Sequence, residues 1–138
     1  MTNISAQTCQ SIAELLEIIG QPARMQILVV LSAQDSCVCH LEAALGLRQA
    51  AISQHLALLR RCGLASARRD GRHVYYRLAD ARALDVLRCA AEMLHLPPET
   101  LAPPPMPIPG CPCPFCRPDL AADQACKKSI PQTEKLHV

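Results

Sequence analysis

Cysteine is the residue type in this sequence that points most clearly to chemistry. Nine of the 138 residues are cysteines, and two of them, Cys37 and Cys39, flank a single valine. Three more, Cys111, Cys113 and Cys116, have a Cys-x-Cys-x-x-Cys spacing. Thiolates bind soft ions and are also the reactive form in thiol oxidation. The two groups therefore predict a site for a thiophilic ion or a thiol switch.

The first pair cannot form a complete site by itself. Residues two apart on a regular helix point to opposite sides, so Cys37 and Cys39 can share an ion only if the helix opens or begins late. Asp35 and Ser36 are candidate N-caps that would allow a late start. A third ligand must come from the Cys-x-Cys-x-x-Cys run, in the same or the other protomer, or from Cys9 near the N-terminus. We favour the run over Cys9, although the run could also form a separate three-thiolate site.

The other cysteines and the chain as a whole carry less information. Cys62 is interpreted as a packing residue, whereas Cys89 and Cys126 have no partner by spacing. The first ten residues lack a basic start followed by an apolar stretch, and the longest apolar run is too short to span a bilayer. We expect a cytoplasmic protein with reduced thiols and no membrane contact.

The elements that must position these residues follow from hydrophobic periodicity and from glycine and proline. The sequence predicts helices around residues 12–19, 22–31, 39–45, 48–62 and 80–95, and a hairpin over 64–78 with Asp70-Gly71 as its two-residue turn. Gly46 and Gly63 are expected to end two of the helices. From Pro97 onward eleven prolines prevent a continuous helix. This order is that of a winged helix-turn-helix.

The helix over 48–62 and the hairpin are suited to binding DNA. One helix face carries Ile52, Leu56 and Leu59, and the opposite face is small and polar. The turn would place Arg69 opposite Arg72, where like charges repel unless phosphates neutralise them. The candidate DNA-binding residues are Gln49, Ser53, Gln54, His55, Arg61, Arg69 and Arg72.

Four segments together resemble the ArsR/SmtB repressors: 19–28 (IGQPARMQIL), 51–56 (AISQHL), 59–64 (LRRCGL) and 70–78 (DGRHVYYRL). The resemblance implies a homodimer, joined through its first and last helices, on operator DNA with two-fold symmetry. It also implies that an inducer releases the operator. The segment from Cys37 to Leu41 resembles the Cys-Val-Cys motif of the arsenic- and cadmium-responsive branches, except that Glu42 replaces their third cysteine. The family's zinc-type motif on the last helix is broken, because Arg82 replaces its histidine.

The sequence thus predicts a mainly α-helical, homodimeric winged helix-turn-helix protein with a β-hairpin wing. We expect an N-terminal arm over residues 1–10, a DNA-binding and dimerisation domain over 11–96, and a tail rich in proline and cysteine over 97–138. The expected function is a repressor released by arsenite, cadmium or lead, bound through Cys37, Cys39 and the tail cysteines. A redox- or polysulfide-responsive repressor is the alternative, followed by a thiol-rich metal buffer. No phosphate-binding loop or hydrolytic motif supports an enzyme.

Overall fold

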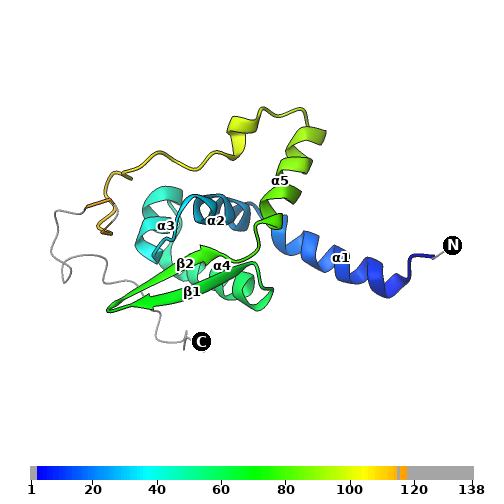
Figure 1. Ribbon diagram of the computed structural model, residues 1–138, viewed down its shortest axis with the longest axis horizontal. Coiled ribbons are helices and arrows are strands. Elements are labelled where there is room, and N and C mark those ends of the chain that lie inside the picture. The colour runs from blue at the N-terminus through cyan, green and yellow to red at the C-terminus, as the bar shows by residue number, and fades with distance from the viewer. Residues whose placement is uncertain (1–2, 115, 118–138) are drawn as a thin grey trace.

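The order of helices and strands that the sequence predicts is confirmed by the computed structural model, which describes residues 3–114 and 116–117 (Figure 1). Its elements are α1 (Ala6–Ile19), α2 (Pro22–Ala33), α3 (Val38–Leu45), α4 (Gln49–Arg61), β1 (Ala65–Asp70), β2 (His73–Leu78), α5 (Arg82–Met93) and the short 3-10 helix η1 (Pro98–Leu101). Helices α3 and α4 form the helix-turn-helix, and β1 and β2 pair as the antiparallel wing.

The boundaries of α3 and α4 follow from local chemistry. Gly46 ends α3 with φ 67°, and Gly63 follows α4 with φ 75°. Both values lie in the left-handed region that glycine adopts without steric cost. The turn at Gly46 reverses the chain, so that α4 packs against α2. The turn at Gly63 leads directly into β1.

The main core lies between α2, α4, β2 and α5. The predicted inner face of α4 is confirmed, because Ile52, Leu56 and Leu59 are fully buried. Val74 and Tyr76 of β2 join this core, as their alternation predicts. Tyr75, on the opposite face of β2, packs into a second buried cluster with Cys37 and Cys111.

The wing differs from the prediction by one residue. Asp70 pairs with His73 and Arg69 pairs with Val74, so the two turn residues are Gly71 and Arg72. The expectation that Arg69 faces Arg72 is therefore wrong. Gly71 has φ 61° and occupies the first turn position, where a type II′ turn requires glycine, so the register shifts from the one predicted for Asp70-Gly71.

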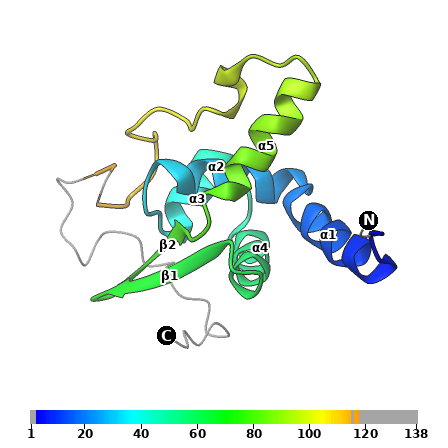
Figure 2. The same cartoon turned by 45° about the vertical axis from the view of Figure 1, so that its right-hand side comes forward.

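The two ends of the described chain lie far apart in space. Helix α1 begins at Ala6 and projects from the domain, so Cys9 lies within this helix rather than ahead of it. After α5 and η1 the chain returns past α2 to α3, as both views show (Figure 2). Among the described residues no single helix is long and apolar enough to cross a membrane, and α1 with α2 meets that test only as a pair bent by 75°. Cys126 lies outside the described residues.

Candidate metal centre

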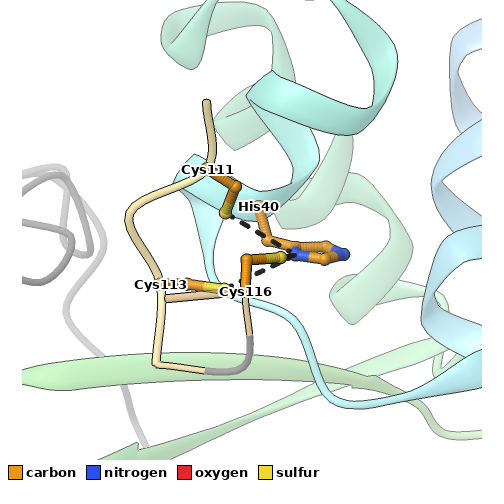
Figure 3. Close-up of side chains that lie close together, drawn as sticks. All are labelled: His40, Cys111, Cys113 and Cys116. Carbon is orange, nitrogen blue, oxygen red and sulfur yellow. Dashed lines mark hydrogen bonds between the residues drawn. The ribbon is translucent and has the colours of Figure 1, made fainter. Parts of the chain in front are cut away.

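The returning tail places its three predicted cysteines against one histidine of α3 (Figure 3). The Nδ1 atom of His40 lies 3.7 Å from Cys111 Sγ, 3.5 Å from Cys113 Sγ and 3.4 Å from Cys116 Sγ. All four ligand atoms lie within 4.8 Å of one another, and all four residues are buried. The sequence analysis did not single out His40, although its position three residues after Cys37 was a usable signal.

These distances fit a tetrahedral ion. Zinc binds sulfur at about 2.3 Å and nitrogen at about 2.0–2.1 Å, so tetrahedral angles place nitrogen about 3.6 Å from each sulfur. The observed separations of 3.4 to 3.7 Å bracket that value. The residues present therefore fit one tetrahedral ion with three sulfur ligands and one nitrogen ligand.

Backbone amides support the sulfur atoms. The N–H of Ile108 donates to Cys116 Sγ at 3.2 Å, and the N–H of Cys116 donates to the carbonyl oxygen of Cys113 at 3.1 Å. Hydrogen bonds to a sulfur atom favour its charged form. The Ile108 amide therefore favours negative charge on Cys116 Sγ, and the Cys113–Cys116 turn holds these two sulfurs on one side of the tail.

The four buried thiols do not ionise alike. A hydrogen bond from the Cys37 thiol, joined by one from His40, lowers the pKa of Cys113 to about 3. The same bond raises the pKa of Cys37, whereas burial raises the pKa of Cys111 and that of Cys116. These directions favour ionisation of Cys113 before the other three thiols.

Cys37 and Cys39, the pair that the sequence predicts as ligands, lie beside this centre. Cys37 is the N-cap of α3, with extended backbone angles (φ −82°, ψ 168°), which confirms that the helix begins after it. The cap is Cys37 itself and not Asp35 or Ser36, so that expectation is wrong. The Sγ atoms of Cys37 and Cys39 lie 3.4 Å apart in the same buried cluster as the tail cysteines.

The second nitrogen of His40 also has a polar neighbour. The side-chain nitrogen of Gln34 lies 3.5 Å from His40 Nε2. When Nδ1 binds an ion, Nε2 carries the imidazole proton, and a turned Gln34 amide can accept it through its oxygen. Such a partner orients a histidine ligand and makes it a better donor.

Other predicted cysteines are not brought to the centre. Cys9 lies on α1, which is on the other side of the molecule from residues 111–116 in both ribbon views. Cys62 packs against the main core, in agreement with its predicted packing role. Cys89 is exposed on α5.

The candidate DNA-binding residues lie on α4 and the wing. Gln54, Arg61, Arg69 and Arg72 are exposed, whereas Gln49, Ser53 and His55 are partly buried. His55 Nδ1 lies 3.5 Å from the guanidinium of Arg24 on α2, and burial together with that charge lowers the pKa of His55. At neutral pH this imidazole is uncharged, so it can contribute hydrogen bonds rather than charge.

A helix-turn-helix followed by an arginine-rich hairpin defines the class of winged-helix DNA-binding regulators. Residues 21–67 match the profile described as "Bacterial regulatory protein, arsR family". A transcriptional repressor SmtB homolog from Synechocystis is 36% identical over 92 residues, or 67% of this chain and 70% of the relative. The chain belongs to the arsR family of bacterial regulatory proteins, which are regulators of transcription and not enzymes.

Solved structures agree with this assignment. NolR from Sinorhizobium fredii superposes with a TM-score of 0.61 at 30% identity, covering 70% of this chain and all of NolR. Rv0081 from M. tuberculosis superposes with a TM-score of 0.60 at 34% identity, covering 66% of this chain and 92% of Rv0081. The family predicted from the sequence is therefore confirmed, and the winged-helix fold with it.

Proposed function

We propose that this protein is a dimeric repressor that leaves its operator when a thiophilic ion binds between α3 and the tail. The observation that carries the proposal is the group of four buried donors, His40, Cys111, Cys113 and Cys116, at separations that suit one ion. A bacterial regulator of transcription must reach the DNA, and this requirement agrees with the cytoplasmic location expected from the sequence.

The donor set favours a divalent ion. Three thiolates and one imidazole match the tetrahedral coordination of zinc and the soft character of cadmium. Lead would use the same sulfurs, and arsenite would need only the three thiolates. Cys37 remains a predicted ligand, because it is a free thiol in the same buried cluster as the tail cysteines. Cys39 is disulfide-bonded in the structure, so it could bind an ion only after reduction.

The position of the centre suggests how it acts on DNA binding. His40 belongs to α3, which packs against α4 and is joined to it by a short turn. An ion that joins the tail to His40 restrains α3 and, through the packing of α3 on α4, the helix-turn-helix. A coupling free energy of about 1–3 kcal/mol would lower operator affinity roughly 5- to 150-fold.

The exposed apolar face of α1 is the proposed contact with a second copy of the chain. Ile12, Leu15 and Leu16 are exposed there, and Met93 and Leu94 are exposed at the C-terminal end of α5. Exposed apolar side chains grouped on two helices are typical of a protein interface. The resemblance to the family gives the same two helices as the dimer contact.

Operator release tests the proposal directly. Fluorescence anisotropy on a promoter fragment would compare reduced wild-type protein with Cys113→Ser and with Cys89→Ser, during titration with cadmium, zinc, lead or arsenite. We expect ion-dependent release for wild type and Cys89→Ser, and none for Cys113→Ser. Operator binding by the wild type that is unchanged by every ion would overturn the proposal.

One observation favours a second signal, which is oxidation of the buried thiols. Cys37 and Cys113 belong to one buried cluster, Cys113 has the lower pKa of the two, and a peroxide would oxidise its thiolate to a sulfenic acid. Condensation with Cys37 would then form a disulfide and release water. Mass spectrometry after mild oxidation would detect a Cys37–Cys113 crosslink, and its absence would exclude this signal.

A further inference from the structure

The face of β2 turned away from the main core contacts the metal centre. Tyr75 lies between Val74 and Tyr76 in sequence but packs into the cluster of Cys37, Cys111 and the other buried cysteines. Only 5% of its surface is exposed. A wing residue is therefore part of the wall around the four donors.

The ring of Tyr75 also holds an arginine of the wing. Arg68 is the cross-strand partner of Tyr75, and its guanidinium carbon lies 5.2 Å from the ring centroid. The same guanidinium donates to Asp35 Oδ2 at 3.1 Å. A cation over an aromatic face gains free energy, and the ion pair fixes its direction.

The backbone joins this arrangement to the start of α3. Ser36 and Tyr76 exchange two hydrogen bonds, of 2.9 and 2.8 Å, so the segment from Asp35 to Cys37 lies beside β2. Asp35 precedes Cys37 by two residues. The metal centre, Tyr75, Arg68 and Asp35 thus form a continuous chain of contacts from the tail to the wing.

We propose that Tyr75 and Arg68 carry the signal from the metal centre to the DNA, with Tyr75 as a positioning residue. An ion that closes the tail against Tyr75 keeps Arg68 on the ring and on Asp35, away from the phosphates. Without the ion the tail loosens, Tyr75 is uncovered and Arg68 turns to a phosphate. This inference rests on the proposed function, because it describes how the same centre controls the operator.

The salt dependence of operator binding measures this exchange. Each phosphate contact contributes about 0.9 to the slope of log K against log salt concentration. A dimer that withdraws Arg68 from DNA in both protomers therefore makes this negative slope shallower by about 1.8 when cadmium binds. A structural role for Arg68 would leave this difference between the two states unchanged.

The experiment measures operator affinity over a range of salt, with and without cadmium, for the full-length wild type and four variants. Arg68→Gln should lower the ratio of ion-free to loaded affinity by at least about fivefold and abolish the change in slope. Tyr75→Leu should do the same, whereas Tyr75→Phe keeps the ring and the wild-type ratio. Arg69→Gln, an exposed neighbour opposite Val74, should weaken both states equally.

Cadmium affinity, measured by competition with a chromophoric chelator, should be unchanged in Arg68→Gln and Arg69→Gln. A wild-type ratio and slope change in Arg68→Gln would overturn this inference while the proposed function stands. An equal fall of the ratio in Arg69→Gln would overturn it too. If the wild type shows no release at all, the proposed function fails and the inference fails with it.

Discussion

Replacing His40 by asparagine removes the imidazole that supplies the nitrogen ligand among the described residues of the proposed centre, and puts a shorter, neutral amide in its place. The imidazole is buried, with Nδ1 3.4–3.7 Å from three sulfurs, so no exposed group can substitute without rearrangement. Structural zinc sites have binding free energies of about 10–16 kcal/mol, or about 2.5–4 kcal/mol per ligand when shared among four. At about 1.4 kcal/mol per tenfold, His40→Asn should bind cadmium or zinc roughly 60- to 700-fold more weakly.

The affinity would be measured by chelator competition on reduced protein, with cobalt absorption as a report on the ligands. The wild type should give the spectrum of three sulfurs and one nitrogen, and His40→Asn a shifted one. Cys89→Ser is the matched control, because Cys89 is an exposed cysteine on α5 outside the centre. Ion-free operator binding and thermal unfolding show whether the variant is folded. Wild-type affinity and spectrum in a folded His40→Asn protein would refute the assignment of His40 as a ligand.

Three further outcomes are expected. Burial raises the pKa of the Cys111 and Cys116 thiols, so ion binding displaces about two protons, which calorimetry in buffers of different ionisation enthalpy would count. Because these protons must leave, the affinity for the ion should rise with pH. Affinity that is independent of pH would contradict the protonation states described above. Leu15→Glu places a charge on the exposed face of α1 and should give a monomer by light scattering, where a persisting dimer would exclude this face. Gln54→Ala should cost about 1–3 kcal/mol of operator binding in an anisotropy titration if Gln54 contacts a base, and no loss would remove it from the interface.

The fold was predictable because its signals are local. The spacing of Ile52, Leu56 and Leu59 defines the inner face of α4, and glycines 46 and 63 occur where the helices end. The one error in the wing arose because Asp70-Gly71 marks a tight turn without specifying which turn position the glycine takes. The pairing of Asp70 with His73 resolves this, with a shift of one residue.

The metal centre was predictable only in part. The chemistry of the tail cysteines is evident in their spacing, but the contact with His40 joins residues 71 to 76 positions apart through a proline-rich segment. No periodicity describes such a return of the chain. The orientation of Tyr75 toward the centre is likewise a consequence of strand alternation that becomes meaningful only once the tail is placed.

X-ray absorption on zinc-loaded, full-length protein tests the central claim most directly. The account predicts one zinc per protomer with three sulfurs at about 2.3 Å and one nitrogen at about 2.0–2.1 Å, and loss of the sulfur shell in a variant with Cys111, Cys113 and Cys116 changed to serine. A wild-type shell dominated by oxygen and nitrogen, or a sulfur shell that survives loss of the three tail cysteines, would contradict it.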